Sequence, residues 1–154
     1  MMKQRECCTR FARGILFFYG DNKMKYFILT NNPMAAEEFG DTHDVRFVDG
    51  KLIDVLIRAR DLINEGAVLL SHPLYGSVKP NETPFRSILL QQGKSADGEL
   101  PPPADAESVR LIGNAVSAFE KFIDKKEVTD PKLLEDFMVV DLSLLKSAVE
   151  SADR

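Results

Sequence analysis

The stretch that most restricts the fold is the run 25–30, KYFILT, which is followed directly by the turn sequence NNP. The run is continuously apolar and rich in aromatic residues. It lacks the alternation of apolar and polar residues that marks a strand with one solvent-exposed face. Such a pattern is typical of a strand buried on both faces. A strand of this kind needs other elements packed above and below it, so the run predicts a layered domain.

The remaining elements are predicted to alternate between strands and helices. Further strands are expected at 45–50, 67–71 and 85–92, and helices at 34–40, at 51–65, after Asp105, and from Asp130-Pro131 toward Ala152. In the segment 51–65 one face carries Leu52, Val55, Leu56, Ala59, Leu62 and Ile63, with Gly66 as the C-terminal cap. The helix after Asp105 is expected to bury Val109, Ile112, Gly113, Val116, Phe119 and Ile123. Pro33 suits a first helical turn, which makes Asn31 or Asn32 its cap, and Ser143 is a candidate cap for a separate last helix.

This alternation predicts the fold class. Strands joined by helices imply right-handed crossovers, so we expect an α/β single domain with a small, mainly parallel sheet of about four strands and helices on both faces. A chain of 154 residues with 44% hydrophobic content can bury one real core. The domain is assigned to residues 23–154, and residues 1–22 are interpreted as an N-terminal extension.

Charge and cysteine usage exclude several classes of function. The formal net charge is −4, and no basic stretch is interleaved with aromatic residues, so nucleic acid is not expected as a partner. Cys7 and Cys8 are adjacent and have no third cysteine to pair with, which suits a reducing cytoplasm. The apolar run 15–19 is too short for a membrane span or for the core of a signal peptide. The sequence therefore predicts a cytoplasmic protein with no membrane partner.

Metal and nucleotide signatures are missing from the sequence as well. With only two cysteines and two histidines, a zinc site is not expected. The spacing of Asp41, His43, Asp44 and Asp49 fits no helix pair and no calcium loop. There is neither a Walker sequence nor a glycine fingerprint for dinucleotides. We therefore expect no metal and no cofactor.

The candidate site is the polar connection within LLSHPLYGSVKPNETPF, residues 69–85. In open α/β sheets, ligands bind outside the carboxyl ends of the strands, where this connection and TNNP would converge. A pocket there would be lined by Asn31, Asn32, His72, Ser77, Lys79, Asn81, Glu82, Thr83 and Arg86. Lys79 and Arg86 could neutralise a carboxylate or phosphate, with backbone amides around Gly76 completing the cradle.

Two other interpretations of the same residues stay open. In the first, His72 is a general base with Ser77 as nucleophile and Glu82 as orienting group, although the G-x-S-x-G elbow is missing. In the second, the side chains are structural: His72 bonds to the loop backbone, and Lys79 and Arg86 are solvated surface charges. Turns are then closed by Ser77, Asn81 and Thr83.

The segments YFILTNNP, VRFVDG and LLSHPLYGSVKPNETPFRSILL together resemble the GrdX family. These are small proteins encoded with the selenium-dependent glycine, sarcosine and betaine reductase systems of anaerobic amino-acid fermenters. The similarity covers roughly residues 25–150, and HPLYGSVKPNETP is its most specific part. Because the family has no assigned reaction, the resemblance transfers no catalytic residue.

Three functions are open for a chain with these residues in the setting that the resemblance implies. The first is an accessory or binding protein for a small anionic or zwitterionic ligand of the reductase system. The second is a hydrolase or group-transfer enzyme that uses His72. The third is an interaction module that docks on a reductase subunit or forms a homodimer.

Overall fold

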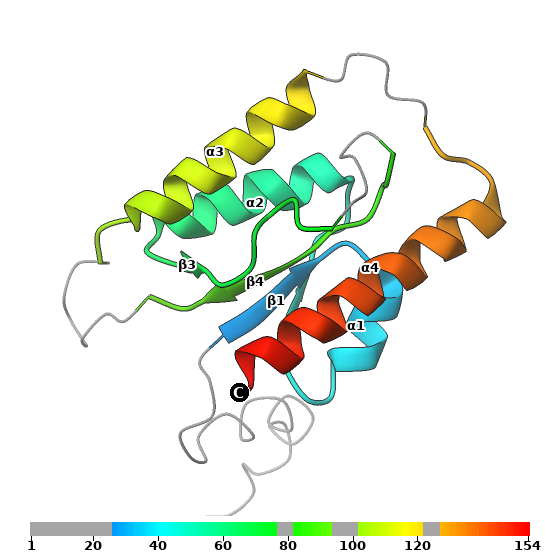
Figure 1. Ribbon diagram of the computed structural model, residues 1–154, viewed down its shortest axis with the longest axis horizontal. Helices are drawn as coiled ribbons and strands as arrows, with labels where there is room; N and C mark the ends of the chain where they lie inside the picture. Colours follow the sequence, from blue (N-terminus) through cyan, green and yellow to red (C-terminus); the bar gives the residue numbers. More distant parts are fainter. Residues whose placement is uncertain (1–25, 77–81, 94–101, 122–126) are drawn as a thin grey trace, which may run out of the picture.

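The computed structural model describes residues 26–76, 82–93, 102–121 and 127–154 (Figure 1). The predicted extension 1–22 lies outside these ranges. In chain order the elements are β1 (Tyr26–Thr30), α1 (Pro33–Phe39), β2 (Asp44–Phe47), α2 (Leu52–Asn64), β3 (Val68–Leu69), β4 (Ser87–Gln91), α3 (Ala106–Glu120) and α4 (Pro131–Ala152). The α/β single-domain prediction is confirmed.

The four strands form one mixed sheet in the order β2-β1-β4-β3. Only β1 and β2 pair in parallel, whereas β4 runs antiparallel to both β1 and β3. The prediction of a mainly parallel sheet is therefore wrong. The physical reason is the connection between β3 and β4, whose described residues 70–76 and 82–86 form no crossover helix, so the chain returns beside the strand that it has just left.

The direction of the strands still brings the predicted loops to one place. Because β4 is antiparallel to both β1 and β3, these two strands point the same way as β2. The segments that leave β1, β2 and β3 therefore emerge at the edge where β4 begins. We call this edge, with its described segments 31–32, 48–51, 70–76 and 82–86, the carboxyl edge.

Helices cover both faces of the sheet, with α2 and α3 on one face and α1 and α4 on the other (Figure 1). Successive residues of β1 serve the two cores in turn. Phe27 and Leu29 pack with α2 and α3, whereas Tyr26 and Ile28 pack with α1 and α4. This two-sided burial explains why the sequence of β1 is apolar without alternation.

The predicted apolar faces of α2 and α3 can be compared with the residues that these helices bury. All six residues predicted to line α2 are buried. In α3 the prediction is partly wrong, because Val109 is 42% exposed and nothing lies within 4 Å of where a Cβ on Gly113 would be. The buried positions are Ser108, Ile112, Ala115 and Phe119, and the predicted Ile123 lies outside the described residues. The Ser108 hydroxyl accepts a hydrogen bond from the Leu69 amide, 2.9 Å away, and a pattern of apolar residues cannot reveal such a polar contact.

The last helix is a single element. Asp130 caps it by accepting from the Lys132 amide at 3.0 Å, and α4 runs without interruption to Ala152. Ser143 lies inside α4, so its predicted role as the cap of a separate helix is wrong. One continuous stripe, Asp141, Leu145 and Val149, holds the helix against the sheet. Of the helices in the described part of the chain, none is both long and apolar enough to cross a membrane.

Two glycines give opposite predictions for stability. Gly66 has φ near +100°, and an added Cβ would lie 2.7 Å from Pro102 Cγ. We expect Gly66→Ala to lower the free energy of unfolding by about 1–2 kcal/mol or more, since it combines left-handed backbone with a steric clash. Gly113→Ala is the matched control in α3, and it should raise the free energy by about 1 kcal/mol through helix propensity. Urea unfolding measures both, and shifts in the same direction would contradict the assignment.

Candidate functional site

The carboxyl edge is held together by the side chain of Asn31. Its Nδ2 donates to the carbonyl oxygens of Gly50, at 3.0 Å, and Pro84, at 2.9 Å. Its Oδ1 accepts from the Arg86 amide at 2.8 Å. One buried amide thus ties the end of β1 to the segment after β2 and to the segment before β4.

Asn32 makes the corresponding connection on the other face of the sheet. Its Oδ1 accepts from the Met34 amide at 3.0 Å, which confirms the prediction that it caps α1. Its Nδ2 donates to the Met138 carbonyl and to Asp141 Oδ2, both at 2.9 Å. Each side-chain amide nitrogen and oxygen of Asn31 and Asn32 therefore has a protein partner. Direct contact of these residues with a ligand stays a prediction.

Asp141 on α4 is the centre of a buried polar network that the sequence analysis missed. Its carboxylate is 3% exposed and accepts from the Ser87 amide at 3.0 Å and the Ser87 hydroxyl at 2.6 Å, in addition to Asn32. Since the Ser87 proton goes to Asp141, the Thr30 hydroxyl must donate across the 2.7 Å contact with Ser87 Oγ. The available signal was a lone aspartate in the apolar run FMVVDLS.

Arg86 lies beside this network and is only 2% exposed. The prediction that it is a solvated surface charge is therefore wrong. Its Nη1 donates to the Tyr75 carbonyl at 2.7 Å, and its guanidinium carbon is 5.6 Å from the centre of the Tyr75 ring. Within the described residues it forms no ion pair with a carboxylate, and its buried Nε has no hydrogen-bond partner.

The Tyr75 hydroxyl is the second buried polar group at this position without a hydrogen-bond partner in the described structure. Burial, followed by the negative charge of Asp141, raises the pKa of the Tyr75 hydroxyl above its ordinary range. Burial also lowers the pKa of Arg86, and the charge of Asp141 opposes that shift. Arginine keeps its charge in proteins, and the raised pKa keeps the Tyr75 hydroxyl neutral at neutral pH. We call this guanidinium cation and neutral hydroxyl the Arg86–Tyr75 pair.

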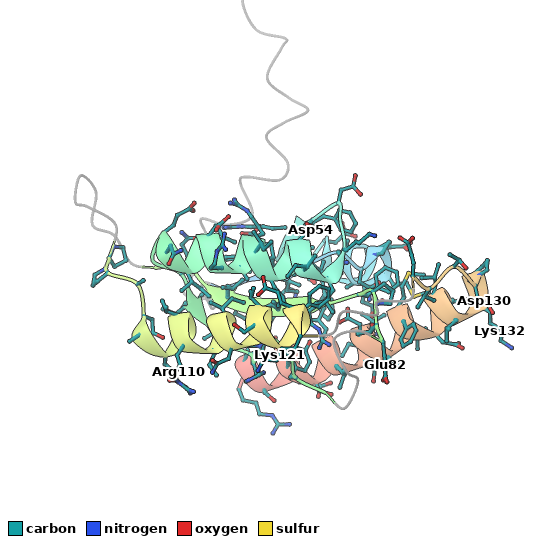
Figure 2. All side chains as sticks on the ribbon, turned by 90° about the horizontal axis from the view of Figure 1, so that it is seen from above. Asp54, Glu82, Arg110, Lys121, Asp130 and Lys132 are labelled. Carbon is teal, nitrogen blue, oxygen red and sulfur yellow. The ribbon has the colours of Figure 1, made fainter. Side chains whose placement is uncertain are left out.

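The other predicted loop residues fall into two groups. Ser77, Lys79 and Asn81 lie outside the described residues, as does the predicted orientation of Lys79 toward an anion. Thr83 is buried, and its hydroxyl oxygen lies 3.3 Å from both the amide and the carbonyl of Phe85, so it closes a turn as expected. Glu82 is exposed (Figure 2).

His72 is exposed, and its Nδ1 accepts from the Leu74 amide at 3.1 Å. This bond confirms the interpretation in which His72 braces the loop backbone. No hydrogen bond joins His72 to Glu82 in the part of the chain that is described, so the proposed orienting contact is not formed there. A catalytic role for His72 stays a prediction.

His43 and the neighbouring Asp44 make contacts with protein side chains. Asp44 pairs with Arg46 at 3.2 Å. His43 Nε2 lies 3.1 Å from the Tyr26 hydroxyl, and its Nδ1 lies 2.8 Å from Thr42 Oγ1. Throughout 26–76, 82–93, 102–121 and 127–154, no three His, Cys, Asp or Glu side chains are grouped so that they could hold a metal ion.

Comparison with known proteins places the chain in a family. The family model described as GrdX-like protein matches residues 27–150, which include most of β1, the carboxyl edge and most of α4. The chain belongs to the GrdX-like family. The match spans the residues of this GrdX-like chain that form the Asp141 network and the Arg86–Tyr75 pair. Searches of curated proteins and of solved structures gave no match.

The Asp141 network predicts a large effect of one substitution in α4. Asp141→Ala leaves the Ser87 amide and hydroxyl and the Asn32 amide without their acceptor. Because hydrogen bonds to a buried charged group contribute about 1.5–3 kcal/mol each, we expect a loss of at least about 3 kcal/mol in the free energy of unfolding.

Asp136→Ala is the matched control on the same helix. Asp136 is exposed, so this variant should stay within about 0.5 kcal/mol of the wild type. Chemical denaturation followed by circular dichroism measures both variants. Equal effects of the two substitutions would show that the Asp141 network does not stabilise the edge.

Proposed function

We propose that this GrdX-like protein binds a small anionic or zwitterionic ligand at the carboxyl edge of its sheet. The observation that carries the proposal is the Arg86 guanidinium, which is buried without an ion-pair partner in the described residues and has an unsatisfied Nε. The unsatisfied Tyr75 hydroxyl beside it points to the same conclusion.

Arg86 costs folding free energy where it stands. A buried charge is normally paired, and the great majority of buried polar atoms have a hydrogen-bond partner. The Asp141 carboxylate already accepts three bonds from Ser87 and Asn32, and it acts on Arg86 only through its charge. An anionic guest would supply the missing acceptor, which is why the exception supports a binding function.

The surroundings of Arg86 support binding because they hold its backbone in place. The Arg86 amide is bonded to Asn31 Oδ1, and the next amide along the chain, that of Ser87, is bonded to Asp141 Oδ1. Both acceptors are buried side chains. A cation fixed in this way is preorganised, so little side-chain and loop entropy would be lost when a ligand binds.

We further propose that the protein acts in the cytoplasm as an accessory to a glycine, sarcosine or betaine reductase system, and that a reductase subunit is a partner. Membership of the GrdX-like family supports this setting. The ligand would then be a small metabolite of that system, such as an amino acid, its N-methylated form or a phosphorylated product.

Thermal unfolding in the presence of candidate ligands tests the proposal. Glycine, betaine, acetyl phosphate, inorganic phosphate and nucleotides would each be added at millimolar concentration. A ligand at about 100 times its dissociation constant stabilises the native state by about 2.7 kcal/mol, which gives a clear rise in Tm. We expect at least one of these compounds to produce such a rise, and Arg86→Gln to abolish it.

The control for charge alone is Arg110→Gln. Arg110 pairs with Glu107 on the surface of α3. It lies far along the molecule from Glu82, which belongs to the same segment of the carboxyl edge as Arg86 (Figure 2). This variant should retain the full ligand-dependent rise. Arg86→Lys serves as a second variant that keeps the charge but loses the planar group of donors. A wild type that no compound stabilises, or an Arg86→Gln variant that still responds fully, would contradict a ligand site at Arg86.

A further inference from the structure

The unsatisfied atoms of the Arg86–Tyr75 pair restrict the chemistry of a guest. Arg86 Nε carries one hydrogen and can only donate, and a neutral Tyr75 hydroxyl also has one hydrogen to donate. Both atoms are shielded from bulk solvent. A bound group would therefore meet at least these two donors, which have no other partner and lie away from bulk solvent, where charge-assisted hydrogen bonds are strong.

The number of donors favours a group with two charged oxygens. A carboxylate has two equivalent oxygens in one plane, one for each donor. A phosphate presents at least three strong acceptor oxygens. The Arg86 Nε and the Tyr75 hydroxyl, which lack partners, satisfy two of these oxygens, and a third would need a donor that is not among them.

The charge of the surroundings favours a monoanion. Asp141 is buried and acts electrostatically on both members of the pair. Its negative charge already balances the positive charge of Arg86, so a bound monoanion leaves one net negative charge in the cluster and a dianion leaves two. Because the cost of burying charge rises steeply with its size, a dianionic phosphate is strongly disfavoured.

We infer that the group held between Arg86 and Tyr75 is a single carboxylate and that the Tyr75 hydroxyl helps to select it over phosphate. This inference rests on the proposed function, which it narrows from small anions in general to carboxylates. Arg86 supplies the charge, Tyr75 supplies the second donor, and Asp141 repels the dianion. Glycine and betaine carry the predicted group, whereas inorganic phosphate and acetyl phosphate present phosphate oxygens instead.

The test compares acetate with inorganic phosphate as minimal probes. Their dissociation constants for the full chain would be obtained from the concentration dependence of Tm at neutral pH and constant ionic strength. We expect acetate to bind at least about tenfold more tightly than phosphate. We expect Tyr75→Phe to weaken acetate binding by roughly 10- to 100-fold, the loss of one hydrogen bond to a charged group. Tyr26→Phe, which removes a hydroxyl bonded to Asp153, is the matched control and should leave acetate affinity unchanged.

The outcomes separate this inference from the function on which it rests. Phosphate binding that equals or exceeds acetate binding, and is lost in Arg86→Gln, would overturn the carboxylate assignment and leave an anion site at Arg86. Acetate binding that Tyr75→Phe does not weaken would overturn the role of the hydroxyl. If neither acetate nor phosphate binds, then Arg86 Nε and the Tyr75 hydroxyl can bond only to water. Both the inference and the proposed function then fail. The comparison of the two probes on the wild type holds even where a variant does not fold.

Discussion

The carboxylate of Asp141 is the interaction on which the arrangement of the carboxyl edge depends. It joins the middle of α4 to the first residue of β4 and, through Asn32, to the turn that begins α1. In sequence, Asp141 is 54 positions from Ser87 and 109 positions from Asn32. A carboxylate can be buried to this extent because Ser87 and Asn32 donate hydrogen bonds that replace those of water. The network therefore selects one position of α4 along the sheet, whereas apolar packing alone would tolerate a shift.

The buried polar groups at the carboxyl edge form two sets, which differ in whether their hydrogen bonds are satisfied. On the side of α1 and α4, the polar groups of Thr30, Ser87, Asn32 and Asp141 satisfy one another. At the Arg86–Tyr75 pair, donors are left over. Buried polar atoms without a partner are exceptions in folded proteins, and such an exception calls for a partner from outside the described chain. The proposed carboxylate site gives that reason in terms of chemistry.

Much of the fold could be predicted from local pattern. The buried strand at 25–30, the apolar face of the helix at 51–65 and the cap at Asp105 depend on neighbours within a few residues, and all three are confirmed. The errors came from features that depend on distant partners. The antiparallel return of β4 follows a connection whose described residues form no helix. The buried face of α3 includes Ser108, whose hydroxyl accepts from the Leu69 amide of β3. The single helix α4 is continuous because its buried stripe of Asp141, Leu145 and Val149 begins before Ser143 and continues after it.

The sequence by itself determined which segments form strands and helices, and that polar residues gather after β1 and between β3 and β4, because these properties follow from short-range periodicity and turn chemistry. Only the tertiary structure decided which of those polar residues are buried. Arg86 and Thr83 are enclosed, whereas His72 and Glu82 are exposed, although all four belong to the same polar stretch. The physical reason is that burial depends on what α4 and the neighbouring strands place over each side chain. No local pattern contains that information.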